Sequence, residues 1–165
     1  MTNVLRNVRA AKIAALLVAA LAMAACAKNP GQDAGALANA SAATPGSQQD
    51  FVVNVGDRVF FNSDSSELTP QSIATLDKQA QWLRSYAQYT FVVEGHADER
   101  GTREYNIALG ARRAQAVHDY LVSRGVQAHR MRTISYGKER PVAVCDDISC
   151  WSQNRRAVTV LNASS

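Results

Sequence analysis

The sequence contains few of the residues that form metal centres or nucleophilic catalytic sites. Its 165 residues include three histidines and three cysteines, and His96, His118 and His129 do not have the spacing of zinc ligands. No exposed-nucleophile motif and no separated carboxylate pair stands in a catalytic context. The sequence therefore predicts no metal, no cofactor and no enzymatic activity. The alternative is a hydrolase that uses Asp98 with Glu99 or with His96 as acid and base.

The sequence also lacks an apolar run long enough to cross a membrane. Its apolar N-terminal stretch, residues 13–27, is shorter than the roughly 20 residues that a transmembrane helix needs. Basic residues precede this stretch and small residues precede Cys26, a pattern typical of a signal peptide over residues 1–25. Loss of that segment would remove three of the positive charges behind the formal net charge of +4. With no lysine-rich run elsewhere, the sequence does not indicate nucleic-acid binding.

Residues 21–26, with the sequence LAMAAC, resemble a bacterial lipobox, in which small residues precede a cysteine that is lipidated and becomes the mature N-terminus. Met23 stands where leucine is usual, but its unbranched apolar side chain suits the same apolar site. The resemblance implies a lipid anchor on Cys26, and two or three acyl chains hold a protein stably to a membrane. Ala27 is not the aspartate that commonly retains lipoproteins in the inner membrane, which favours the outer membrane.

Residues 26–50 are expected to form a lipidated N-terminus and a flexible linker. Ala, Gly, Ser, Asn and Gln dominate residues 28–50, together with two prolines, and this composition cannot bury enough apolar surface to fold. A flexible chain of this length spans about 25 Å on average. Residues 51–165 then leave room for one small domain with a single hydrophobic core.

The pattern of residues 51–165 predicts an α+β domain, a two-layer α/β sandwich of βαβαβ type with about four strands and two main helices. Thr69, followed by proline, favours the start of a helix over residues 70–86, and Thr102 the start of another over residues 103–124. Whether the sheet is entirely parallel stays open. Strands are expected at residues 52–61 (one bent strand or a short hairpin), 89–94, 131–136 and 157–161.

Two adjacent arginines in the second predicted helix fall on different faces. On a helical wheel Arg112 lies on the solvent side, whereas Arg113 lies at the edge of the apolar stripe that contains Ala114. Helical side chains lean toward the N-terminus of their helix, which directs Arg113 at the turn carrying Asp98. We expect the charged tip of Arg113 at the core edge, so that its replacement would leave folding nearly intact.

Asp98 and Arg113 together could bind a zwitterion. A carboxylate and a guanidinium on adjacent elements match the ammonium and the carboxylate of such a ligand. The alternative is that the two residues pair with each other or with neighbouring side chains. The spacing of the residues does not decide between these two interpretations.

Residues 94–121, with the sequence EGHADERGTREYNIALGARRAQAVHDYL, closely resemble the signature of the OmpA-like peptidoglycan-binding domain family, and most of all its peptidoglycan-associated lipoproteins (Pal). Residues 59–68 (VFFNSDSSEL), 135–141 (SYGKERP) and 152–158 (SQNRRAV) resemble further segments of the same family in the same order. The resemblance covers nearly the whole predicted domain and implies an OmpA-like fold.

The resemblance also implies a ligand and a site. In this family the ligand is the meso-diaminopimelate of the peptidoglycan stem peptide, whose side-chain end carries an ammonium and a carboxylate. By their positions in the motif, Asp98 would bind the ammonium, Arg113 would bind the carboxylate, and Asn106 and Leu109 would shape the pocket. Asp64 matches a further binding aspartate. The residue before Asp64 departs from the family, which usually has an aromatic residue there.

The implied function is that of an outer-membrane lipoprotein that binds peptidoglycan non-covalently and faces the periplasm. As a member of the Tol-Pal system, with TolB as partner, it would support envelope integrity and cell division. In the family the TolB surface overlaps the peptidoglycan surface. The alternatives are an OmpA-like lipoprotein of a different system and a cell-wall hydrolase.

Two features near the C-terminal end add further expectations. Cys145 and Cys150 are expected to form a disulfide because an exported protein meets an oxidising compartment. Arg155 and Arg156 precede the last predicted strand. They form either a surface for a partner or a charged entrance to that strand, and the sequence does not decide which.

Overall fold

The structure, a computed structural model, describes residues 43–162. The predicted signal peptide, Cys26 and most of the predicted linker lie outside the described residues. Within the described part of the chain, no helix combines the length and the apolar composition that crossing a membrane would require.

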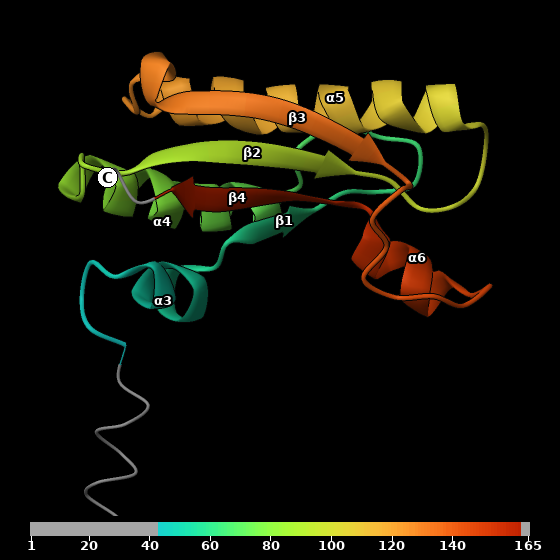
Figure 1. The fold of residues 1–165 in the computed structure, drawn as a ribbon, viewed down its shortest axis with the longest axis horizontal. Coiled ribbons are helices and arrows are strands. Elements are labelled where there is room, and N and C mark those ends of the chain that lie inside the picture. Colours follow the sequence, from blue (N-terminus) through green and yellow to red (C-terminus); the bar gives the residue numbers. More distant parts are fainter. Residues whose placement is uncertain (1–42, 163–165) are drawn as a thin grey trace, which may run out of the picture. The chain divides into compact units, whose positions relative to one another are not determined.

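One mixed four-stranded sheet forms the first layer of the fold (Figure 1). Its strands are β1 (Arg58–Phe60), β2 (Thr90–His96), β3 (Met131–Gly137) and β4 (Arg156–Asn162), in the order β1-β4-β2-β3. Strands β2 and β3 are parallel, and β4 runs antiparallel to both of its neighbours, β1 and β2. The question of a purely parallel sheet is thereby answered: the sheet is mixed.

The second layer consists of two long helices, α4 (Pro70–Ser85) and α5 (Arg103–Ser123), which lie against the sheet in Figure 1. Apolar side chains of both helices and of the sheet form one buried cluster between the layers, among them Leu76, Phe91 and Val117. The predicted α+β two-layer architecture is therefore confirmed. The remaining elements are short: α3 (Gln48–Asp50), η2 (Phe51–Val55), η3 (Ala128–Arg130) and α6 (Ile148–Asn154).

Local signals place the starts of both long helices. The Thr69 side chain accepts a hydrogen bond from the backbone N–H of Ser72, and proline follows at the first helical position. The Thr102 side chain accepts one from the backbone N–H of Tyr105 in the same way. Gly125, with a φ of 86°, follows the end of α5. The predicted bounds of both helices are confirmed to within a few residues.

The prediction of a bent strand or hairpin over residues 52–61 is wrong for its first half. Residues Phe51–Val55 form a single helical turn, closed by a hydrogen bond from the Gly56 N–H to the Phe51 carbonyl, and β1 covers only Arg58–Phe60. Phe51 is completely buried against Trp82, with ring centroids 4.9 Å apart, whereas Val53 is 62% exposed. Burial of one aromatic ring outweighs the local β preference of the valines.

The residues just before Phe51 also contact the domain. Asp50 accepts a hydrogen bond from the indole N–H of Trp82 at 2.8 Å, and the Tyr89 hydroxyl donates to the Gly46 carbonyl at 2.9 Å. The compact unit therefore includes residues that the sequence alone assigns to the linker.

Candidate functional site

A pocket of about 200 Å³ lies where the loop after β1 meets the β2–α5 loop and the first turns of α5. Four of the five predicted binding residues line it together: Asp64, Asp98, Asn106 and Leu109. The other lining residues are Ser63, Arg100, Gly101 and Tyr105. The pocket thus brings two carboxylates and a guanidinium close together.

Close contact between α5 and β2 brings the walls of this pocket together. A Cβ atom on Gly95 would lie 1.8 Å from the carbonyl oxygen of Gly110, so the helix backbone rests directly on the strand. Asn106, 1% exposed, donates from its side-chain amide to the carbonyl oxygen of Arg100 at 2.8 Å. Helix α5 is therefore attached both to β2 and to the loop that carries Asp98.

Asp98 is the most strongly bonded acid of the pocket. Its Oδ1 accepts from the backbone N–H of Arg100 at 3.3 Å and from Arg100 Nε at 3.2 Å, and its Oδ2 accepts from Arg100 at 2.7 Å and from Arg155 at 3.3 Å. Burial by itself raises the pKa of the Asp98 carboxyl, but the hydrogen bonds from Arg100 and Arg155 outweigh it and the pKa lies below its ordinary value. Asp98 is thus an anion at neutral pH.

The position expected for Arg113 at the core edge is wrong, because its side chain is completely buried. Its guanidinium donates to three backbone carbonyls, those of Ser65 at 2.8 Å, His96 at 2.8 Å and Asn62 at 3.1 Å. The predicted direction toward the turn before Asp98 is confirmed by the bond to His96, and Arg112 is exposed, as predicted.

Arg113 keeps its positive charge in this buried position. Desolvation lowers the pKa of its guanidinium to about 10, partly offset by the nearby charge of Asp98. A group with this pKa is protonated at neutral pH. Arg113 does not line the pocket, and three of the five N–H bonds of its guanidinium are used by the carbonyls. It therefore holds the loop after β1 and places a cation behind the pocket.

Asp64 stands at the tip of that loop, exposed to solvent. Its φ of 54° lies in the left-handed region, which aspartate adopts more readily than most residues. The hydroxyl of Tyr105 on α5 donates a hydrogen bond to its carboxylate. The loop and the helix thus meet across the pocket through this pair.

Sequence reasoning missed three residues that contact the predicted site. Arg100 stands two positions after Asp98, and this short separation within one loop was a signal that could have found it. Tyr105 was detectable only by its place in the first turn of the helix. Arg155 is 57 residues away from Asp98 in the chain, so nothing local indicates their ion pair. Asp98 therefore forms ion pairs with Arg100 and Arg155. This agrees with the alternative interpretation, in which Asp98 pairs with side chains of the protein itself.

The Arg155–Arg156 pair is internal rather than an exposed surface. Arg155 is 7% exposed and donates to the Phe61 carbonyl as well as to Asp98. Arg156 is 4% exposed and donates to the carbonyls of Asn154 and Arg140. Both side chains connect β4 to the loops at one end of the sheet.

His96 lies behind the loop of Asp98 and is 2% exposed. Neither of its ring nitrogens has a hydrogen-bond partner, and its ring lies 5.6 Å from that of Tyr136. Desolvation, with smaller contributions from the charges of Arg156 and Arg140, lowers the pKa of the His96 imidazole to about 4. It is neutral at physiological pH. Within residues 43–162, no three His, Cys, Asp or Glu side chains gather as a metal site would require.

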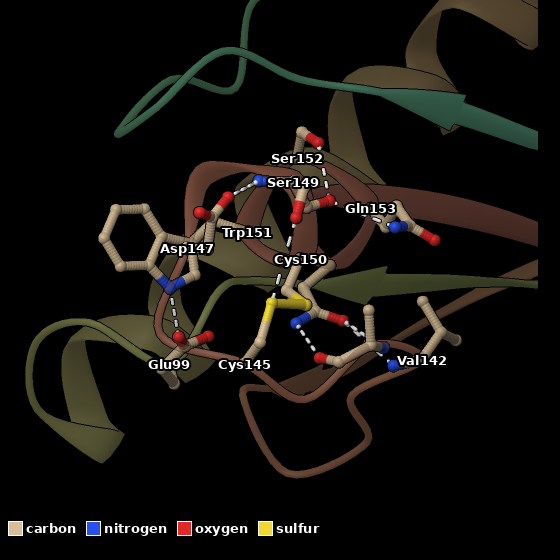
Figure 2. The surroundings of a disulfide bond; sticks show 11 residues. Glu99, Val142, Cys145, Asp147, Ser149, Cys150, Trp151, Ser152 and Gln153 are labelled. Carbon is tan, nitrogen blue, oxygen red and sulfur yellow. Dashed lines mark hydrogen bonds between the residues drawn. A yellow bond between two sulfur atoms is a disulfide. The ribbon is translucent and has the colours of Figure 1, made fainter.

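Cys145 and Cys150 form a disulfide, with Cα atoms 5.7 Å apart, at the start of helix α6 (Figure 2). Helix α6 lies outside the two main helices expected from the sequence and was not predicted. The side chain of Asp147 caps the helix, accepting from the backbone N–H of Ser149 at 2.7 Å. Trp151, next to Cys150, donates from its indole N–H to the carboxylate of Glu99 in the β2–α5 loop (Figure 2).

Comparison with known proteins identifies the family of this chain. The model of the OmpA family matches residues 60–157. The chain is 69% identical over 151 residues to a peptidoglycan-associated lipoprotein of Rhizobium meliloti, covering 90% of this chain and 86% of the relative. It is 61% identical over 163 residues to that of Brucella melitensis, covering 97% of both chains.

A solved structure shows the same fold. The crystal structure of the peptidoglycan-associated lipoprotein from Burkholderia pseudomallei is 44% identical, with a TM-score of 0.63 over 64% of this chain and 90% of that chain. The family match covers the whole pocket, from the loop after β1 to the start of β4. This chain therefore belongs to the OmpA family and, within it, to the peptidoglycan-associated lipoproteins.

Proposed function

We propose that this protein binds peptidoglycan non-covalently, without catalysis, and connects the outer membrane to the cell wall. The observation that carries the proposal is the pocket in which Asp98 lies beside cationic side chains. Relatives that are 61% and 69% identical are named peptidoglycan-associated lipoproteins.

The chemical match is with the side-chain end of meso-diaminopimelate, which carries one ammonium and one carboxylate. Asp98 offers a buried anion for the ammonium. Arg113 contributes a buried positive charge behind the pocket, which favours a carboxylate inside it. Asn106 and Leu109 form the helix side of the pocket, and Asp64 forms its outer rim.

The remaining parts of the proposal concern the membrane and protein partners. A lipid on Cys26 would hold the protein in the outer membrane, facing the periplasm, with residues 26–50 as the connection to the domain. We propose TolB and the Tol-Pal system as its partners, with a role in envelope integrity and cell division. These points follow from the sequence motifs and from family membership.

The experiment is co-sedimentation of the full-length protein, in mild detergent, with purified peptidoglycan sacculi that contain diaminopimelate. Asp98→Asn keeps the size of the side chain but removes its charge, and we expect it to lower the affinity about tenfold or more because a charge-assisted bond is lost. Arg112→Ala, on the exposed face of α5, is the control and should bind like wild type. Equal binding by all three proteins would show that the ligand sits elsewhere.

The same material separates the alternative functions. Soluble fragments released from the sacculi by the wild-type protein would indicate a hydrolase. Capture of TolB in a pull-down supports the Tol-Pal assignment. Retained binding to sacculi without TolB capture would favour a lipoprotein of another system.

A further inference from the structure

Arg100 occupies the acidic side of the pocket. Its guanidinium forms a two-pronged ion pair with Asp98, from Nε to Oδ1 at 3.2 Å and from a terminal nitrogen to Oδ2 at 2.7 Å. The same side chain donates to the Ser63 hydroxyl at 2.8 Å, across the pocket. Arg100 thus bridges the β2–α5 loop and the loop after β1.

With Arg100 in this position, Asp98 has little capacity for another donor. A carboxylate accepts about four hydrogen bonds, and Asp98 already accepts three from Arg100 and one from Arg155. An incoming ammonium must therefore displace Arg100 from at least part of this carboxylate. A displaced guanidinium without a new partner loses a charge-assisted pair.

A zwitterionic ligand removes this cost because it exchanges partners with the protein. Its ammonium takes the place of the Arg100 guanidinium on Asp98, and its own carboxylate becomes the new partner of Arg100. A ligand that carries only an ammonium offers Arg100 nothing in return. We propose that Arg100 is a specificity-determining residue, which makes the pocket accept a zwitterion and reject a purely cationic side chain. This inference rests on the proposed function.

Of Arg100, Arg113 and Arg155, Arg100 is the one whose side chain is free to move with a ligand. Its side chain is 44% exposed, whereas Arg113 is completely buried and Arg155 is 7% exposed. Both buried arginines are also attached to backbone carbonyls. The hydrogen bonds that the Arg100 side chain gives up on moving are those to Asp98 and Ser63.

Trp151 positions Arg100 at the mouth of the pocket. The Arg100 guanidinium carbon lies 4.2 Å from the centroid of the Trp151 ring, a cation–π contact. The ring is itself held by its bond to Glu99 and by the disulfide at the neighbouring Cys150 (Figure 2). Helix α6 and its disulfide thus support the residue that selects the ligand.

The test compares two tetrapeptides, L-Ala–γ-D-Glu–X–D-Ala, in which X is meso-diaminopimelate or L-lysine. The two ligands differ by one carboxylate on the side chain of X. We expect the full-length wild-type protein to bind the diaminopimelate peptide about tenfold tighter or more in calorimetry. For Arg100→Ala the ratio of the two affinities should fall to about twofold or less, because the lysine peptide no longer has to displace the Arg100 guanidinium from Asp98.

Arg124→Ala is the matched control. Its side chain is 48% exposed and forms an ion pair with Asp77 at 2.9 Å, so it resembles Arg100 in exposure and pairing but lies away from the pocket. The control should keep the wild-type ratio. A ratio that persists in Arg100→Ala, or a wild type that binds both peptides equally while still binding sacculi, overturns the inference alone. A wild type that binds neither the peptides nor sacculi overturns the proposed function as well.

Variants at Trp151 test the positioning role. Trp151→Phe keeps an aromatic face under Arg100 and should keep most of the preference for the diaminopimelate peptide over the lysine peptide. For Trp151→Ala, the logarithm of this affinity ratio should fall to half of the wild-type value or less. Trp82 and Trp151 are the two tryptophans of the chain. Ligand addition should therefore change tryptophan fluorescence in wild type but not in Trp151→Phe. Discrimination unaffected in Trp151→Ala would contradict the assignment.

Discussion

At the scale of single residues, the site depends on charged side chains whose roles follow from their burial. Arg100 lines the pocket and Arg113 lies behind it. Arg113 is completely buried and donates to three backbone carbonyls, whereas Arg100 is partly exposed and pairs with a carboxylate. A buried arginine held by the backbone is part of the fold, because its removal leaves carbonyl groups without donors. An exposed arginine on an acid is free of that constraint and can exchange partners.

Arg113→Ala is therefore expected to destabilise the protein by about 2–4 kcal/mol, since three carbonyls lose their donor and a cavity remains. The measurement is urea-induced unfolding followed by circular dichroism. Arg112→Ala, on the exposed face, should change the free energy of unfolding by less than about 0.5 kcal/mol. Similar stability of the two variants would mean that the buried guanidinium is dispensable for folding.

At the scale of secondary-structure elements, helix α6 and its disulfide form a unit at one end of the sheet (Figure 1). The side chain of Asn154 at the end of α6 accepts from the backbone N–H of Val142 at 2.9 Å and donates to the Ala143 carbonyl at 2.8 Å. These bonds and the disulfide attach the helix to its own preceding loop. Their effect should therefore be local rather than shared with the whole sheet.

We expect the double variant Cys145→Ser with Cys150→Ser to lose about 2 kcal/mol of stability or less, because the disulfide closes only a short loop. Hydrogen exchange should become faster in α6 and in residues 142–147, with little change in β2 and α5. Gln153→Ala, at an exposed position of α6, serves as control. Equally accelerated exchange throughout the sheet would show that the disulfide stabilises the entire domain.

At the scale of the whole molecule, stability depends on how many protons the folded and unfolded chains bind. The His96 imidazole has a pKa of about 4 in the folded protein against an ordinary value of 6.5. Glu94 lies 3.7 Å from it and favours the charged form, but burial and the charges of Arg156 and Arg140 outweigh this effect. Between these two pKa values the unfolded chain binds the additional proton.

The free energy of unfolding should therefore fall as the pH is lowered from about 6.5 to about 4, by an amount on the order of 2 kcal/mol. His96→Phe keeps a ring against Tyr136 and removes the titrating group, so its stability should vary less in this range. His129→Gln, at an exposed position, should keep the wild-type slope. The check is thermal unfolding at a series of pH values, and parallel profiles of all three proteins would exclude His96 as the cause.

Much of the candidate site was predictable because most of it lies within one continuous segment. Asp98, Asn106 and Leu109 share the β2–α5 loop and the first turns of one helix, where local periodicity determines which side chains lie together. The actual depth of Arg113 was not predictable, since a helical wheel gives the direction of a side chain but not how much of the neighbouring loop covers it. The burial of Phe51 likewise depends on Trp82, a distant partner.

The amino-acid sequence was sufficient to predict the class of the fold, the approximate bounds of the long helices, the placement of Asn106 and Leu109 at the pocket, and the family of the protein. These features depend on periodicity, helix caps and motifs, which act over a few residues. The packing of the elements was needed to establish the mixed strand order, the burial of Arg113, the ion pair of Asp98 with Arg155, and the contact of Arg100 with Trp151. These contacts join residues far apart in the chain, so that the competition between desolvation and pairing is settled only when the elements pack together.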